Sequence, residues 1–295
     1  MPEGPEVETI RSGLAASVAG QKIAQVNVLF GRTFAAGDEL IRRQVEGAVI
    51  DRVERRGKVL LVGLSSGWTM LMHLKMTGQV VLVRADGERL AGGHPTGSMA
   101  AKLPDGSTRV EFVLATGDRL YFNDQRKFGW IKLVPSDSVT SDPNVSNIGP
   151  EVLGDDFTAT YFAGQLKRRS RSPVKAVLLD QSVVAGVGNI YADESLHLSR
   201  IHPARLAGTL TDSEIKRLHG GIREIIAAGI RHGGTSFSHY VNSLGGTGDY
   251  LQVRRVFRRE GQACPVCGTT IIKTRVAGRG THLCPNCQKL SRTER

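Results

Sequence analysis

The first residues of the chain follow the pattern of a helix with one apolar face. Pro5 suits the first turn of a helix, where its missing N–H costs nothing, and Gly20 is a plausible end. Between them, apolar side chains recur at helical spacing at Val7, Ile10, Leu14 and Val18. The pattern predicts a helix that begins almost at the start of the chain.

From residue 22 to residue 134 the pattern changes to short β-rich runs separated by glycine or charged turns. Several strands without intervening helices indicate an antiparallel sandwich or barrel. Residues 84–107, rich in glycine, proline and alanine, predict a long loop, and residues 137–147 predict a linker. The predicted strands are Lys22–Leu29, Val45–Glu54, Lys58–Leu64, Trp68–Leu74, Gln79–Leu82, Arg109–Leu114, Arg119–Phe122 and Trp130–Val134.

Helical spacing returns between residues 157 and 232 and predicts a small helical bundle. Thr211, with Glu214 three residues later, forms a capping-box pattern for the last of these helices. Residues 233–250 contain five glycines and predict a flexible loop, which is usually either a lid or a connector. The predicted helices are Phe157–Lys167, Val174–Leu179, Ala192–Leu198 and Asp212–His232.

The composition describes a basic globular protein of about two domains. The chain has 295 residues, of which 40% are hydrophobic and 23% are charged, and its formal net charge is +11. This charge favours a polyanionic partner, with nucleic acid first, although a merely basic surface is the alternative. No apolar run is long enough to span a membrane, and the N-terminus lacks the layout of a signal peptide, so we expect a cytoplasmic protein.

All four cysteines fall in one short segment and have the spacing of a metal site. The Cys264–Cys267 and Cys284–Cys287 hooks are separated by 16 residues, which matches a tetrahedral four-cysteine zinc site. Four thiolates leave no open coordination position, so we predict one structural Zn²⁺ and no catalytic metal, with four free thiols as the alternative. Arginine and lysine side chains around the hooks predict contact with phosphate, or else a zinc ribbon that only stabilises the fold.

The start of the chain, Met1-Pro2-Glu3, carries a candidate nucleophile. Removal of Met1, which is usual before a residue as small as proline, would leave Pro2 with a free secondary amine. An α-amine titrates near pH ~8 rather than the ~10.4 of lysine, so more of it is neutral and able to form a covalent imine. Glu3 is placed beside it to transfer protons. Many proteins begin Met-Pro, so the remaining motifs decide whether this start is catalytic.

Three further motifs lie in predicted turns. Asn123–Gly129 offers two cations and an aromatic ring, which can read base edges or wedge into a base stack, although many surface turns have this composition. His73–Gly78 ends another strand, and a methionine such as Met76 is more often a core residue there. Gly186–Tyr191 lacks the preceding strand that dinucleotide binding requires. Its amides and Asn189 would suit a DNA phosphate, or the motif is a plain turn between helices.

Together these motifs resemble the formamidopyrimidine-DNA glycosylase family of bacterial base-excision repair enzymes, over nearly the whole chain. The resemblance implies an α+β multidomain protein in which DNA lies in a basic cleft. Its implied parts are an N-terminal catalytic antiparallel β-sandwich with a leading helix (2–135), a linker (136–150), a helix–two-turn–helix domain (151–250) and a four-cysteine zinc-finger β-hairpin (251–295). The motifs that carry it are Pro2-Glu3, Arg56-Gly57-Lys58, His73–Gly78, Asn123–Gly129, Gly186–Glu194 and Arg279–Cys284.

The resemblance implies a bifunctional DNA glycosylase and AP lyase that flips an oxidised purine, such as 8-oxoguanine or a formamidopyrimidine, out of double-stranded DNA. Pro2 would attack C1′, and the resulting Schiff base would permit β- and δ-elimination at the lesion or at an abasic site. Glu3 would protonate the sugar ring oxygen, Glu6 would be structural, and the loop 233–250 would close over the lesion. The implied catalytic residues are Pro2, Glu3, Lys58 and Arg279. The implied phosphate contacts are Lys58, His73, Asn189 and Arg279, and the residues that fill the vacated space are Met76, Arg126 and Phe128.

Several features depart from the family pattern. Arg258 stands where the family usually has glycine, Ala263 precedes the first cysteine, and the 84–107 segment is long. Gly4 is common in the related endonuclease VIII branch, which keeps open an enzyme for oxidised pyrimidines, although Met76 and the 126–128 motif match the purine branch. A non-catalytic damaged-DNA-binding zinc protein is the third hypothesis. The family further implies a monomer without a membrane partner, acting on the DNA of a bacterial nucleoid.

Overall fold

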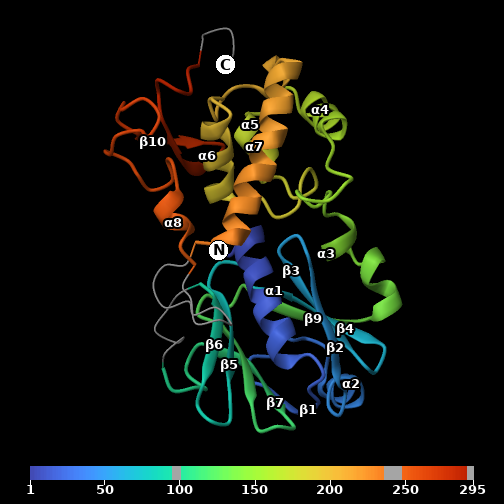
Figure 1. Cartoon of the computed structure of the whole chain (residues 1–295). Coiled ribbons are helices and arrows are strands. Elements are labelled where there is room, and N and C mark those ends of the chain that lie inside the picture. The colour runs from blue at the N-terminus through green and yellow to red at the C-terminus, as the bar shows by residue number, and fades with distance from the viewer. Residues whose placement is uncertain (95–100, 236–247, 291–295) are drawn as a thin grey trace. The chain divides into compact units, whose positions relative to one another are not determined.

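The computed structural model describes residues 1–94, 101–235 and 248–290, and the chain divides into two compact units (Figure 1). The first unit comprises Met1–Ser146 together with His232–Asp249. The second comprises Asn147–Arg231 together with Tyr250–Arg295. The four-cysteine segment therefore belongs to the same unit as the helices that precede it. The domain ends at residues 135, 150 and 250 remain predictions from the sequence.

The first unit contains two antiparallel sheets, which confirms the predicted sandwich. One sheet has the strand order β1-β7-β8-β5-β6, and the other has the order β2-β3-β4-β9. One contiguous apolar core draws alternate residues from strands of both sheets, for example Leu60, Val62 and Leu64 from one sheet and Val110, Phe112 and Leu114 from the other. The strands are β1 (Ile23–Val28), β2 (Ile50–Arg56), β3 (Val59–Leu64), β4 (Trp68–His73), β5 (Gly78–Val83), β6 (Arg89–Gly93), β7 (Thr108–Leu114), β8 (Arg119–Asp124) and β9 (Trp130–Pro135).

The leading helix α1 (Gly4–Val18) packs along the edges of both sheets (Figure 1). It contacts β2 at the edge of the four-stranded sheet and β6 at the edge of the five-stranded sheet. Its predicted apolar face is buried at all four positions, Val7, Ile10, Leu14 and Val18. Pro2 and Glu3 directly precede this helix, which is itself packed on both sheets.

Four short elements of this unit differ from the sequence prediction. The 84–107 segment was predicted as a loop, yet it contains β6, whose glycines are poor strand formers and whose backbone is held by pairing with β5. The helix α2 (Asp38–Gln44) escaped prediction because it buries only Ile41. The predicted linker contains a 3₁₀ helix, η2 (Ser136–Ser141), and one helical turn, α3 (Pro143–Ser146).

The second unit combines a helical bundle with a two-stranded hairpin. The helix predicted from Ala192 begins three residues earlier, at Asn189, and Thr211 and Glu214 form the predicted reciprocal cap. No helix among the described residues is long and apolar enough to cross a lipid bilayer. The elements are α4 (Ala159–Arg168), α5 (Val174–Leu179), α6 (Asn189–Leu198), η3 (Ala207–Thr209), α7 (Asp212–Arg231), α8 (Tyr250–Val253), β10 (Ile272–Val276) and β11 (Arg279–Leu283).

Candidate active site and nucleic-acid interface

The N-terminal motif lies at the start of α1, where the side chains of Pro2 and Glu3 are buried. Glu3 is the N-cap residue of the helix, and only 3% of its surface is exposed, whereas Met1 is 43% exposed. The backbone N–H of Glu3 donates to Oε2 of Glu6 at 2.9 Å. Pro2 therefore directly precedes a buried carboxyl group at the start of α1.

Glu6 links this N-terminus to the segment that follows α7. Its Oε1 accepts hydrogen bonds from the backbone N–H and the hydroxyl of Thr235, at 2.7 and 2.8 Å. Gly234, with φ of 81°, lies so close that a Cβ atom there would be 2.9 Å from Cγ of Glu6. A hydrogen bond between Nδ1 of His232 and the Asp249 carboxyl group, at 2.6 Å, joins the two ends of the same segment. Residues 236–247 of the predicted lesion-covering loop lie outside the described residues.

His73 ends β4 and is largely buried beside two lysines. Its Nδ1 accepts the backbone N–H of Lys75 at 2.9 Å, so the hydrogen of the neutral ring lies on Nε2. Burial, together with the charges of Lys75 and Lys58, lowers the pKa of His73 from 6.5 to about 3. His73 is therefore neutral at physiological pH and carries an Nε2–H donor rather than a charge. Lys58 lies in the two-residue turn between β2 and β3 and is 7% exposed.

A buried carboxylate organises the two loops that carry Met76 and Arg126. Asp124, which is fully buried, accepts the hydroxyl of Thr77 and the backbone N–H of Gly129. The backbone N–H of Arg126 is shared between the Thr77 hydroxyl, at 3.0 Å, and the Asp124 carboxylate, at 3.2 Å. The turn after β4 and the turn after β8 are thus held as one rigid pair.

The side chains that these loops present are exposed although two of them are apolar. Phe128 is 53% exposed and Met76 is 39% exposed. The guanidinium of Arg126 lies 4.8 Å from the centre of the Phe128 ring, which favours a common orientation for the pair. Exposed apolar side chains on rigid turns are typical of groups that insert into a partner, and an intercalating role fits them.

The second unit brings Asn189 and the Arg279 turn together. Nδ2 of Asn189, at the start of α6, donates to the carbonyl of Gly280 at 3.0 Å. Arg279 is exposed and begins β11 directly after the tight turn at Ala277 and Gly278, both of which have positive φ.

A buried ion pair fixes this hairpin to the helical bundle. Lys175 and Asp193 are both fully buried and lie 2.6 Å apart. Lys175 also donates to the Gly280 carbonyl and to the Thr281 hydroxyl, and Asp193 accepts the backbone N–H of His282. The sequence prediction missed this pair, as it missed Thr77 and Asp124. The sequence around Lys175 does not predict a buried ion pair, because its partner Asp193 lies on a different helix.

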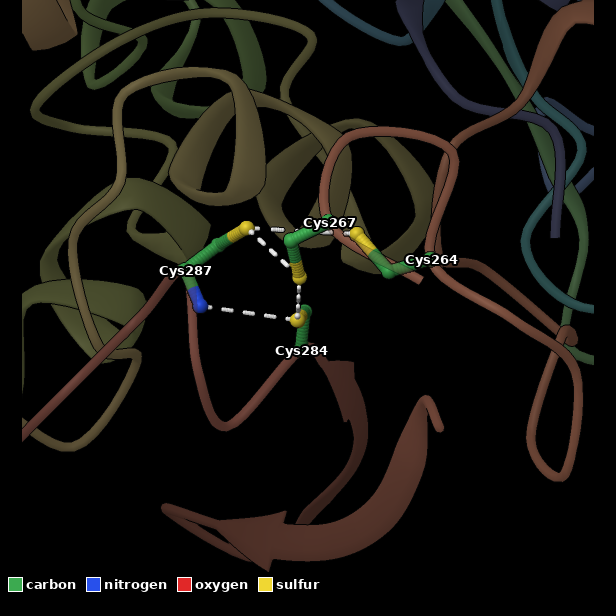
Figure 2. Close-up of side chains that lie close together, drawn as sticks. All are labelled: Cys264, Cys267, Cys284 and Cys287. Carbon is green, nitrogen blue, oxygen red and sulfur yellow. Dashed lines mark hydrogen bonds between the residues drawn. The ribbon is translucent and has the colours of Figure 1, made fainter. Parts of the chain in front are cut away.

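The four cysteines converge on one point, as predicted (Figure 2). Their sulfur atoms all lie within 4.8 Å of one another, and three of the separations are 3.5, 3.5 and 3.9 Å. A tetrahedron with metal–sulfur bonds of about 2.3 Å has sulfurs about 3.8 Å apart. The donor set and its spacing therefore fit a four-coordinate metal ion. Six residues before the first cysteine, Arg258 has φ of 51°, a backbone region that favours glycine.

The predicted site residues thus form separate groups within the two units. The first unit holds Pro2, Glu3 and Glu6 at α1, Lys58 with His73, and Met76 with Arg126 and Phe128. The second unit holds Asn189 with the Arg279 turn, and the four cysteines.

Comparison with known proteins identifies the family. Residues 1–131 match the formamidopyrimidine-DNA glycosylase N-terminal domain, residues 148–241 its H2TH domain, and residues 261–290 the zinc finger found in FPG and IleRS. A Formamidopyrimidine-DNA glycosylase of Pelotomaculum thermopropionicum is 41% identical over 291 residues, which cover 98% of this chain and all of that protein. The chain belongs to the formamidopyrimidine-DNA glycosylase family.

Solved structures of this family have the same fold. One is a Lactococcus lactis FPG mutant in complex with a Fapy-dG containing DNA, which is 35% identical with a TM-score of 0.86. Another is the wild-type L. lactis FPG with an oxidised-pyrimidine containing DNA, also 35% identical, with a TM-score of 0.85. Each match covers 98% of this chain and the whole of the other. The formamidopyrimidine-DNA glycosylase fold therefore extends over both units.

Proposed function

We propose that this protein is a bifunctional DNA glycosylase and AP lyase that excises oxidised purines from double-stranded DNA and then nicks the strand. The observation that carries the proposal is the buried Pro2–Glu3 start at α1, in a chain that matches its family over nearly its full length. Its substrates are 8-oxoguanine and formamidopyrimidine lesions, and abasic sites are substrates of the second step.

The chemistry begins once Met1 has been removed and the Pro2 nitrogen is free. This nitrogen attacks C1′ of the flipped nucleoside, and the bond from C1′ to the base breaks with its electron pair leaving on the base. Glu3 donates a proton to the sugar ring oxygen, so the ring opens and C1′ forms an imine with Pro2. Loss of a proton from C2′ then expels the 3′ phosphate, and a second elimination expels the 5′ phosphate. Hydrolysis of the imine returns the free amine.

The remaining site residues hold the DNA. Phosphates are bound by Lys58 and by the neutral Nε2–H of His73 in the first unit, and by Asn189 and Arg279 in the second. Met76, Arg126 and Phe128 fill the space that the flipped base vacates, with Arg126 facing the orphaned cytosine. Insertion recovers part of the cost of unstacking. Because the net charge is +11, DNA binding should weaken steeply as salt is raised.

The metal in this proposal is one Zn²⁺ with a structural role. Cys264, Cys267, Cys284 and Cys287 would hold it, and four thiolates leave no position for substrate. When bound, the ion supplies only cross-linking of the hairpin segment. The protein would act as a monomer on nucleoid DNA in the bacterial cytoplasm, in keeping with its bacterial relatives.

The proposal is tested by borohydride trapping on a duplex with one 8-oxoguanine opposite cytosine, beside a duplex with thymine glycol. We expect a covalent adduct mainly on the first duplex, and loss of that adduct in Pro2→Gly. Trapping mainly on thymine glycol would identify an endonuclease VIII-like enzyme, the alternative that Gly4 keeps open. Binding to both duplexes without any adduct would identify a non-catalytic damage-binding protein.

A further inference from the structure

A histidine on the helical bundle reaches one of the four cysteine sulfurs. His197 lies in the last turn of α6, and its Nε2 is 3.4 Å from Sγ of Cys264. Both residues are buried, with 2% of His197 and 3% of Cys264 exposed. The two residues are 67 positions apart in the chain, so the contact arises from the docking of the cysteine segment on α6.

The surroundings of the ring determine which nitrogen carries the hydrogen. Nδ1 of His197 is buried and has no hydrogen-bond partner within the described part of the chain. A hydrogen on Nδ1 would therefore be a buried donor without an acceptor, which costs about 1–3 kcal/mol. A hydrogen on Nε2 points instead at a sulfur that is a thiolate whenever a metal is bound. The favoured tautomer is thus an Nε2–H donor directed at Cys264.

The negative charge of the four-thiolate metal site explains how such a donor would stabilise it. A divalent ion with four thiolates has a net charge of −2, which is costly at buried sulfurs such as those of Cys264 and Cys284 unless N–H groups surround them. Backbone N–H groups make contacts of this kind, among them Val266 to Cys264 at 3.5 Å and Cys287 to Cys284 at 3.4 Å. His197 adds a side-chain donor from a different element of the fold.

The same helix makes several other contacts with the cysteine segment. Glu194 accepts the backbone N–H groups of Arg255, Val256 and Phe257, and Asp193 accepts that of His282. The helix begins at Asn189, which donates to Gly280. One rigid element therefore contacts the hairpin turn at one end and a metal ligand at the other.

We propose that His197 donates an Nε2–H hydrogen bond to the Cys264 thiolate, and that this bond slows loss of the metal by stabilising the charge on that ligand. The inference rests on the proposed Zn²⁺ site and extends it to a residue outside the four ligands. It makes α6 part of the metal centre rather than only its support.

The test compares His197→Phe, which keeps a ring but removes the donor, with His197→Gln, whose amide can place an N–H near the same point. Zinc content of each purified protein is measured first, and then the rate of zinc transfer to a chromophoric chelator. We expect His197→Phe to release zinc about tenfold faster, as for other groups that hydrogen-bond metal ligands. His197→Gln should remain close to the wild-type rate. Equal release rates for wild type and His197→Phe would overturn the proposal.

A second measurement separates the hydrogen bond from packing. In the cobalt-substituted protein, a thiolate without its donor is a better electron donor, so the sulfur-to-cobalt charge-transfer band should move to lower energy in His197→Phe and not in His197→Gln. If the Phe variant fails to fold, the wild type itself decides. NMR of cadmium-substituted, isotope-labelled protein should show the His197 hydrogen on Nε2 with scalar coupling to the metal, and a hydrogen on Nδ1 would refute the bond. Wild-type protein that holds no zinc would instead contradict the proposed metal site.

Discussion

Thr77 donates its hydroxyl to Asp124, and this bond joins two loops that leave different strands. Thr77 lies between β4 and β5, whereas Asp124 is the last residue of β8. Because Asp124 is fully buried, its carboxylate depends on these donors for its stability. Met76 directly precedes Thr77, and Arg126 lies two residues after Asp124. The bond between Thr77 and Asp124 therefore sets the positions of Met76 and Arg126 relative to each other.

The first prediction concerns Thr77→Val, which removes the hydroxyl but keeps the shape of the side chain. The variant leaves a buried carboxylate with one donor fewer, which costs about 1–3 kcal/mol. We expect the single-turnover rate of 8-oxoguanine excision to fall by about tenfold, with a smaller effect on cleavage of a preformed abasic site, where no base must be flipped. Thr77→Ser retains the hydroxyl and should behave as wild type. An equal loss in both variants would exclude the hydroxyl as the cause.

The second prediction concerns Glu6→Gln. The Glu6 carboxylate accepts from Glu3 with one oxygen and from Thr235 with the other, and an amide has a single acceptor oxygen. One of the two contacts must therefore fail, and hydrogen bonds to a charged group contribute about 1.5–3 kcal/mol. We expect excision to slow by at least about tenfold. Glu8→Gln, in the same helix, removes the charge that pairs with Arg11 and Arg55 and that accepts from the Ser12 hydroxyl, and it should retain most activity. Matching losses in the two variants would argue against a positioning role for Glu6.

The third prediction concerns the pH dependence of stability from His73. Its pKa is lowered to about 3 in the folded protein, so between about pH 6.5 and pH 3 the unfolded chain binds a proton that the folded chain does not. Stability is therefore complete above the unfolded pKa and decreases as the pH falls. At about pH 5 the loss is about 2 kcal/mol relative to about pH 8. Both tryptophans, Trp68 and Trp130, lie in the first unit, so their fluorescence follows its unfolding in urea.

His73→Gln should reduce this pH dependence by about that amount. A variant that loses as much stability as wild type on acidification would show that other groups cause the effect.

The fourth prediction concerns the buried pair of Lys175 and Asp193. Lys175→Met leaves Asp193 as an uncompensated buried charge, which costs about 3–5 kcal/mol. We expect amide hydrogen exchange in β10 and β11 to accelerate by several orders of magnitude. The matched control is Lys273→Met, which removes an exposed ion pair with Glu260 and should cost about 1 kcal/mol or less. Similar exchange in the two variants would mean that the buried pair does not anchor the hairpin.

The sequence pattern predicted those features that depend on residues close together in the chain. The apolar spacing of Val7 to Val18 predicted α1, and the spacing of the four cysteines predicted their convergence. Pattern failed at β6, where glycines form a strand only because β5 supplies hydrogen-bond partners. It also failed where a side chain takes its meaning from a distant partner. Thr77 and Asp124 are 47 residues apart, and Asn189 and Gly280 are 91 apart.

The roles of individual site residues came from the family resemblance rather than from residue chemistry alone. Phe128 and Met76 illustrate this, because the residue types of the turns that carry them are also found in many ordinary surface turns. The structure adds two features that neither residue chemistry nor the family resemblance predicted. They are the tautomer of His73 and the Asp124 carboxylate that holds the Met76 and Arg126 loops together.

The central claim is that the Pro2 nitrogen forms the imine, and the position of the reduced adduct tests it most directly. Protein from which Met1 has been removed would be trapped with borohydride on 8-oxoguanine DNA, digested and analysed by mass spectrometry. We expect the sugar remnant on the nitrogen of Pro2, in the N-terminal peptide, and no adduct in protein that retains Met1. An adduct on a lysine such as Lys58, or undiminished trapping with Met1 still attached, would contradict the account.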